Sequence, residues 1–150
     1  MKCAKLLLSI PLLTLSLTAM ADDYASKDDA IAMVGKVIAA IKVDQQKTYD
    51  AINARAPQWI IHDLYPVVYD FQGKVLAHGQ NAALVGTVML EKKDPDGKLF
   101  IKERIDLAQS QGTFWQDYKY ADPVSKNVLP KQMYCQRLDD SVVCAGVYKR

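Results

Sequence analysis

Apolar and polar residues alternate along two neighbouring runs, 64–71 and 74–78, as is typical of β-strands. Gln72 and Gly73 separate the two runs, and the glycine can supply the positive φ that a tight turn requires. The pattern therefore predicts an antiparallel hairpin. Because both of its faces are largely apolar, we expect the sheet to be covered on both sides.

The pairing of this hairpin decides which side chains share a face. Counting outward from the turn places Tyr69 opposite Leu76. Two residues further from the turn, Val67 lies opposite His78. Tyr65, Tyr69 and His78 then occupy one face, and their polar tips indicate a cavity or a hydrogen-bonded core on that side.

A helical pattern precedes the hairpin and runs from Ser26 to about Ala54. Ser26 can cap the first turn, a break near Val43 and Asp44 is compatible with the pattern, and Pro57 ends it. Its apolar stripe should lie on a sheet. The residues of this expected stripe are Ile31, Val34, Ile38 and Ile41.

The remaining elements follow the hairpin. A helix is predicted over 99–110, and further strands over 114–120, 131–138 and 141–148. The fold class is therefore α+β, with a long N-terminal helix packed on an antiparallel sheet of about five strands.

The last two strands flank Asp139 and Asp140, which can form a two-residue turn. Counting outward from this turn places Cys135 directly opposite Cys144. An oxidising compartment would then favour a disulfide between the two strands. The alternative is a pair of buried free thiols.

The first residues have the pattern of a secretory signal peptide. Lys2 and Lys5 precede an apolar run over 6–17, and small residues before Asp22 give a cleavage site after Ala21. Cys3 lies ahead of the apolar run, where a lipoprotein cysteine would not be. The prediction is a signal peptide over residues 1–21, no lipid anchor, and a periplasmic or secreted protein.

Charge restricts the possible partners of the mature chain, residues 22–150, which has the length of a single domain. Lys2 and Lys5 account for the net charge of +2, so the chain without its signal peptide is neutral. Neither nucleic acid nor an anionic membrane surface is therefore an expected partner.

Metal sites and cofactors have little support in the sequence. Asp94 and Asp96 resemble the start of a calcium loop, but Ile105 stands where a bidentate glutamate is required. His62 and His78 are the only histidines, and neither has a second ligand at metal-binding spacing. We expect no metal and no cofactor.

Enzyme chemistry also lacks a motif, because the chain has neither a Gly-x-Ser-x-Gly sequence nor a glycine-rich phosphate loop. A hydrolase or lyase with His78 as general base is the one catalytic alternative. His62 and Asp63 are expected to form a surface pair.

Hydrogen-bonding aromatics and one cation accumulate on the predicted strands. Such groups can hold a small carboxylate, although tyrosine and tryptophan are also ordinary core residues. The set comprises Tyr69, His78, Trp115, Tyr118, Tyr120, Lys131 and Tyr134.

Four segments together resemble the single Cache domains of the second type, which are extracytoplasmic relatives of PAS domains. They read VVYDFQGKVLAHGQNAALVG, KDPDGKLFIKE, FWQDYKYADPVSKNVLPKQMY and VCAGVYK. The resemblance implies a PAS-like sheet with a pocket for small organic acids such as acetate, propionate, pyruvate or lactate. It implies binding or sensing without catalysis, with a membrane receptor or transporter as partner; the alternative is a secreted interaction module with a vestigial pocket.

The resemblance also assigns site residues. Lys131 would neutralise the carboxylate, and His78 and Tyr118 would donate hydrogen bonds to it. Tyr134 and Trp115 belong to the same motifs, but strand alternation separates Tyr134 from Lys131 and Trp115 from Tyr118. Either Lys131 precedes its strand, or one member of each pair belongs to the core.

Overall fold

Two consecutive helices begin the computed structural model, which describes residues 24–150, so the predicted signal peptide lies outside the described residues. Helix α1 (Lys27–Val43) starts at Ser26, whose side chain and that of Asp29 form a capping box. Asp44 has extended backbone angles and ends α1, and its side chain caps helix α2 (Gln45–Asn53). The pattern left open whether the helix continues or breaks near Val43 and Asp44, and the structure shows the break.

A five-stranded antiparallel sheet follows, with the strand order β2-β1-β5-β4-β3. Helix α3 (Phe100–Gln111) and the short 3-10 helices η1 (Pro57–Trp59) and η2 (Ala82–Leu84) lie between strands or before them. The predicted α+β class is confirmed. The strands are β1 (Pro66–Asp70), β2 (Val75–His78), β3 (Thr113–Ala121), β4 (Val128–Leu138) and β5 (Ser141–Tyr148).

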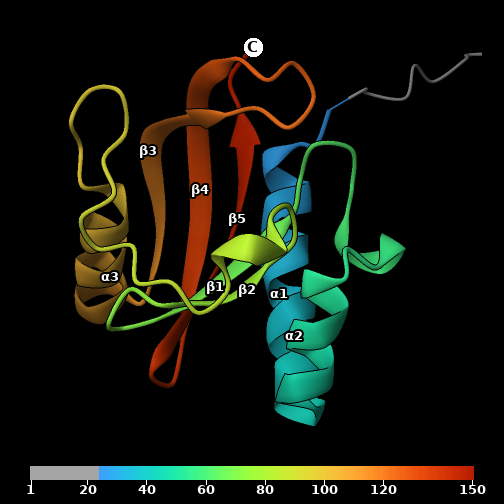
Figure 1. Ribbon diagram of the computed structural model, residues 1–150. Coiled ribbons are helices and arrows are strands. Elements are labelled where there is room, and N and C mark those ends of the chain that lie inside the picture. Colours follow the sequence, from blue (N-terminus) through green and yellow to red (C-terminus); the bar gives the residue numbers. More distant parts are fainter. Residues whose placement is uncertain (1–23) are drawn as a thin grey trace, which may run out of the picture.

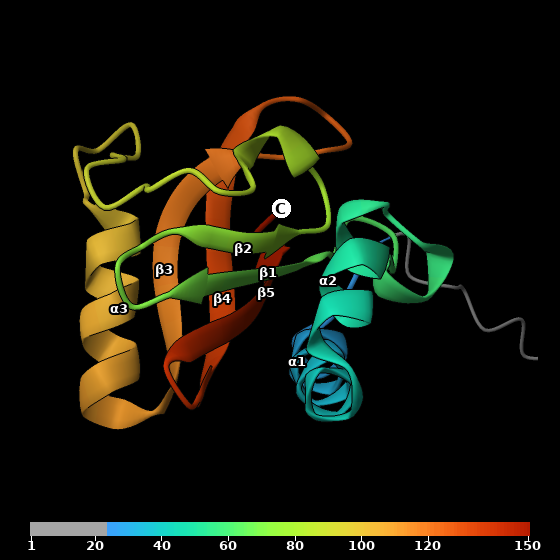
Figure 2. The same cartoon turned by 60° about the horizontal axis from the view of Figure 1, so that its bottom comes forward.

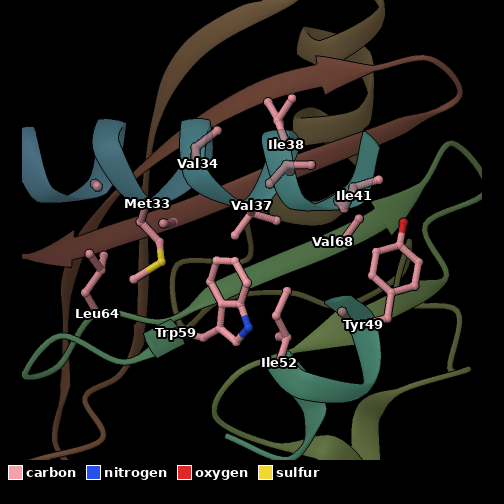
Figure 3. Close-up of a cluster of buried hydrophobic side chains, with 14 of the residues drawn as sticks. Met33, Val34, Val37, Ile38, Ile41, Tyr49, Ile52, Trp59, Leu64 and Val68 are labelled. Carbon is pink, nitrogen blue, oxygen red and sulfur yellow. The ribbon is translucent and has the colours of Figure 1, made fainter. Parts of the chain in front are cut away.

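Helices cover the sheet on opposite sides, α1 and α2 on one side and α3 on the other (Figures 1 and 2). On the first side, side chains of α1 pack toward Val68 of β1, together with Ile52 and Trp59 (Figure 3). On the second side, Phe100 and Ile105 of α3 pack with side chains of β1, β3, β4 and β5. The sheet therefore separates two hydrophobic cores.

One residue predicted for the apolar stripe of α1 does not lie on it. Ile31 is 43% exposed, whereas Val34, Ile38 and Ile41 are buried as expected. The actual stripe begins at Ala30, one residue earlier, so Ile31 is rotated by about 100° away from the sheet.

The final hairpin has the register counted from its turn. Leu138 pairs with Ser141 and Cys135 pairs with Cys144, across a turn in which Asp139 has a φ of 52°. The two cysteines form a disulfide with a Cα–Cα distance of 4.2 Å. The predicted cross-strand disulfide is confirmed, and the two cysteines are not free thiols.

The first hairpin differs from its expected register at one point. Val67 pairs with His78 as predicted, but Tyr69 pairs with Val75 rather than with Leu76, because a bulge interrupts the ladder next to Val68. Val75 therefore joins Tyr69 in the core on the α3 side, and Leu76 packs against the core beneath α1.

The turn of this hairpin is longer than the predicted two residues. Strand β1 ends at Asp70, whose side chain accepts hydrogen bonds from the backbone N–H groups of Gln72 and Lys74. Gly73 has the expected positive φ, 74°. The side chain of Asp70 thus binds backbone N–H groups of the turn that no strand partner binds.

Candidate ligand-binding site

Lys131 lies at the centre of the candidate site, on the α3 side of the sheet. It lies on β4, between β3 and β5, opposite Tyr118 of β3 and Tyr148 at the end of β5. Its side chain is 1% exposed. The ammonium donates hydrogen bonds to the hydroxyl oxygens of Tyr65, at 3.1 Å, and Tyr148, at 3.2 Å.

The charge of Lys131 has no anionic partner, because none of the ion pairs within residues 24–150 includes it. Burial, and secondly the positive charge of Arg104, lower the pKa of Lys131 to about 7. Asp63 and Asp122 act in the opposite direction at longer range. Lys131 is therefore partly charged at neutral pH and can gain an anionic partner.

A glycine on β5 leaves room for the lysine side chain. A Cβ atom at Gly146 would lie 3.0 Å from Cε of Lys131 and 2.9 Å from Sδ of Met133. A side chain at Gly146 would therefore crowd Met133 and Lys131, which would have to shift to make room for it.

His78 ends β2 and faces the same region. Its ring stacks on Tyr65 with 5.4 Å between the ring centroids. Nδ1 accepts backbone hydrogen bonds from Gln80, at 3.2 Å, and Asn81, at 3.0 Å. Because Nδ1 is an acceptor, the proton of the neutral ring is on Nε2. Burial and the nearby Lys131 lower the pKa of His78 to about 4, so at neutral pH the imidazole offers one N–H donor.

Helix α3 adds a second buried cation, Arg104, which is 0% exposed. Its Nε donates to Oε1 of Gln116 at 3.0 Å, and its Nη1 donates to the hydroxyl of Tyr69 at 3.3 Å. Tyr118 lies with its ring centroid 5.0 Å from the guanidinium carbon. Burial raises the pKa of Tyr118 far above its usual range, so its hydroxyl keeps its proton.

A cavity of about 310 Å³ opens beside these groups, between the end of β2 and the loop that joins β3 to β4. Tyr65 and His78 line it, so it reaches the phenol that holds Lys131 and the histidine that can donate. Lys131 is not among the residues that line this cavity, although the phenol that accepts its hydrogen bond is. The other lining residues are Gln80, Asn81, Tyr120, Ala121, Asp122, Pro123 and Lys126.

Two buried carboxylates beside this cavity are neutralised by one arginine. Arg150 forms ion pairs of 2.8 Å with Asp63 and with Asp122. The expected surface pair of His62 and Asp63 is therefore wrong, because Asp63 is buried and is bound by Arg150. Since Arg150 holds both carboxylates, neither of them forms an ion pair with Lys131.

The sequence-predicted residues divide between the two faces of the sheet. Tyr69, His78, Tyr118 and Lys131 lie on the α3 side or at its margin. Trp115 and Tyr134 pair with each other on the α1 side, with 5.2 Å between their ring centroids. Side chains alternate between the two faces along a strand, so Trp115 and Tyr134 lie on the face away from the cavity, and the structure does not bring them to it. Lys131 itself lies inside β4, not before it.

Three residues of the site had not been assigned a ligand role from the sequence: Tyr65, Arg104 and Tyr148. Tyr65 stood on the correct face of the predicted hairpin, and Tyr148 follows from the parity of β5. The signal for Arg104 was a charged residue at a core position of an amphipathic helix, between Ile101 and Ile105.

Residues 24–150 contain neither a metal-binding cluster nor a membrane-spanning helix. No group of three or more His, Cys, Asp or Glu side chains in this part of the chain could hold a metal ion. Nor does this part contain a helix with the length and apolar character needed to cross a membrane.

Several solved structures share this fold. A methyl-accepting chemotaxis protein from Vibrio parahaemolyticus is 25% identical, with a TM-score of 0.69 over 81% of this chain and 87% of that one. A Cache chemosensory domain whose structure concerns carboxylic acid recognition is 19% identical, with a TM-score of 0.70 over 82% of this chain and 92% of that one. At 19% identity, the comparison with the Cache chemosensory domain shows a shared fold and nothing further.

Sequence comparison leads to the same class of sensor proteins. The sensor histidine kinase MctS of Rhizobium johnstonii is 34% identical over 88 residues, which are 57% of this chain and 19% of the kinase. The chain thus spans about a fifth of that relative. The family model for single Cache domain 2 matches residues 16–149. Cache domains are extracytoplasmic ligand-sensing modules, and this chain belongs to the single Cache domain 2 family.

Proposed function

We propose that this Cache domain senses a short carboxylate, which binds to Lys131. The observation that carries the proposal is a fully buried ammonium whose hydrogen-bond partners within residues 24–150 are the phenol oxygens of Tyr65 and Tyr148. A buried charge without a counter-ion destabilises a protein, and a ligand carboxylate would remove that cost through a charge-assisted hydrogen bond. The chemosensory domain described above, whose structure concerns carboxylic acid recognition, has the same fold, and the ligand class is carried over from it as part of this proposal.

His78 is proposed as a hydrogen-bond donor to this ligand, without a catalytic role. His78 lines the cavity, and its Nδ1 already accepts two backbone hydrogen bonds, so Nε2–H is the donor that remains for a ligand. A pKa of about 4 makes His78 a weak general base at neutral pH. These two properties favour ligand binding over the hydrolase or lyase alternative.

The protein is further proposed to act in the periplasm and to pass its ligand state to a membrane receptor or transporter. The disulfide between Cys135 and Cys144 supports an oxidising compartment, as does the signal-peptide pattern of the sequence. The likeness to a chemotaxis protein and to a sensor kinase supports a signalling role.

The proposal is tested by measuring thermal stability and binding heat with acetate, propionate, pyruvate, lactate and succinate. A ligand at 100 times its dissociation constant should stabilise the protein by about 2.7 kcal/mol. Lys131→Met should abolish this stabilisation and keep the fold, because methionine fills a similar volume without a buried charge. Lys42→Met is the matched control, since Lys42 is exposed on α1.

Two outcomes would contradict the proposal. If none of the carboxylates stabilises the wild-type protein, the interaction module with a vestigial pocket is favoured. If Lys131→Met binds the same acid with unchanged affinity, the carboxylate does not sit on Lys131.

A further inference from the structure

Arg104 is a second buried cation that lacks an anionic partner. Its Nη2 is buried and has no hydrogen-bond partner among residues 24–150. Its other two donors bind neutral oxygens, those of Gln116 and Tyr69. Arginine side chains that are fully buried normally bind a carboxylate or phosphate, because the cost of removing their charge from water is several kcal/mol.

The surroundings of Arg104 offset only part of this cost. The aromatic rings of Tyr69, Phe100 and Tyr118 lie 5.0 to 5.5 Å from the guanidinium carbon, which gives cation–π contacts. Glu103 is the adjacent carboxylate on α3, but it pairs with Lys98 at 2.8 Å and accepts from the side-chain amide of Gln116. The forked donor of Arg104 thus keeps a free N–H group within an aromatic enclosure.

Arg104 and Lys131 lie on the same side of the sheet. Arg104 contacts Gln116, and Lys131 pairs with Tyr118, which is two residues further along β3. Two residues of a strand correspond to about 7 Å, so the β3 residues beside the two cations are offset by about the length of a small dicarboxylate. The positive charge of Arg104 is also close enough to depress the pKa of Lys131.

We propose that the site takes a dicarboxylate, with one carboxylate on the Lys131 ammonium and the other on the free Nη2 of Arg104. This inference rests on the proposed function, because it places the first carboxylate on Lys131. A monocarboxylate would leave the Arg104 donor buried and unpaired, whereas a dicarboxylate supplies a charged acceptor to it.

The test compares acids of equal chain length by calorimetric titration of the purified protein. The pairs are malonate with propionate, succinate with butyrate, and glutarate with pentanoate. The best dicarboxylate should bind at least about tenfold more tightly than its matched monocarboxylate, as expected from one charged hydrogen bond. Arg104→Met should reduce this ratio to below about threefold, while the exposed control Arg137→Met should preserve it.

Arg104→Lys provides a second variant if the methionine variant does not fold. Lysine keeps the charge but lacks the forked donor, so the preference for a dicarboxylate should fall without vanishing. If Arg104→Lys instead keeps the full wild-type ratio, Arg104 does not hold the second carboxylate.

The outcomes separate this inference from the proposed function. A wild-type protein that binds monocarboxylates as tightly as dicarboxylates would overturn the role of Arg104 and leave Lys131 as the anchor. An Arg104→Met variant that loses affinity for both classes equally would also overturn it. Failure of every carboxylate to bind would overturn the proposed function itself, and this inference with it.

Discussion

Lys131 and Arg104 are the two cations buried on the α3 side of the sheet, and within residues 24–150 neither pairs with a carboxylate. Each is held by neutral oxygens and aromatic rings. Such groups orient a cation without neutralising it. The ligand-free site is therefore organised for an anion, and its own positive charges disfavour the empty state.

The affinity for a carboxylate should fall as the pH rises above about 7. The pKa of Lys131 in the free protein is about 7, so below this pH the ammonium is already charged. Above it the amine is neutral and must take up a proton before it can pair with the ligand. The affinity should therefore fall by up to about tenfold per pH unit above pH 7, as calorimetric titration between about pH 6 and pH 9 would measure.

Arg104→Met provides an internal check on this pH dependence. The Arg104 charge is the second cause of the low pKa of Lys131, after burial. Its removal should move the midpoint of the affinity profile to higher pH. His78 does not titrate in this range, because its pKa is about 4. A flat profile, or a midpoint that moves downward in Arg104→Met, would contradict the assignment of Lys131.

The hairpin of β4 and β5 contains the disulfide, and reduction of this disulfide should destabilise the protein. Cys135 and Cys144 are nine residues apart, so chain entropy predicts a loss of about 2.5 kcal/mol in the free energy of unfolding. Reduction removes the cross-link without removing buried atoms. Urea unfolding of oxidised and reduced protein measures the difference, and equal midpoints would show that the cross-link adds nothing.

The two hairpins differ in how far their register could be predicted from the sequence. The turn at Asp139 and Asp140 is regular, so counting along both strands placed Cys135 opposite Cys144 correctly. In the first hairpin, the bulge beside Val68 shifted the register. The bulge leaves no residue-type signal, because both of its neighbours on β1 are apolar or aromatic strand formers.

Helix α3 shows why Arg104 was not predicted as a residue of the candidate site. The helix predicted over 99–110 agrees with Phe100–Gln111, but its buried face includes Arg104. An arginine on a helix is normally solvated, so the pattern alone does not reveal a buried one. The partners of Arg104 come from β1 and β3, which are distant in sequence. Only the assembled sheet brings Tyr69 and Gln116 to the same guanidinium.

At the scale of the whole molecule, Arg150 connects three segments that lie far apart in sequence. It binds Asp63, which precedes β1, and Asp122, in the loop after β3. Asp63 also accepts a hydrogen bond from the backbone N–H of Ala25, just before α1. Because Asp122 and the segment around it line the cavity, the same ion pairs hold one wall of the candidate site.

Arg150→Met should therefore destabilise the whole domain. It would leave Asp63 and Asp122 buried without a counter-charge, which we expect to cost about 2–4 kcal/mol in the free energy of unfolding, since Arg150 is partly exposed. Lys149→Met is the matched control, because its ion pair with Asp117 is exposed on both sides and should contribute less than about 1 kcal/mol. Urea unfolding of both variants at neutral pH gives the comparison. Equal losses in the two variants would mean that Asp63 and Asp122 are solvated, and that Arg150 does not hold the wall of the cavity.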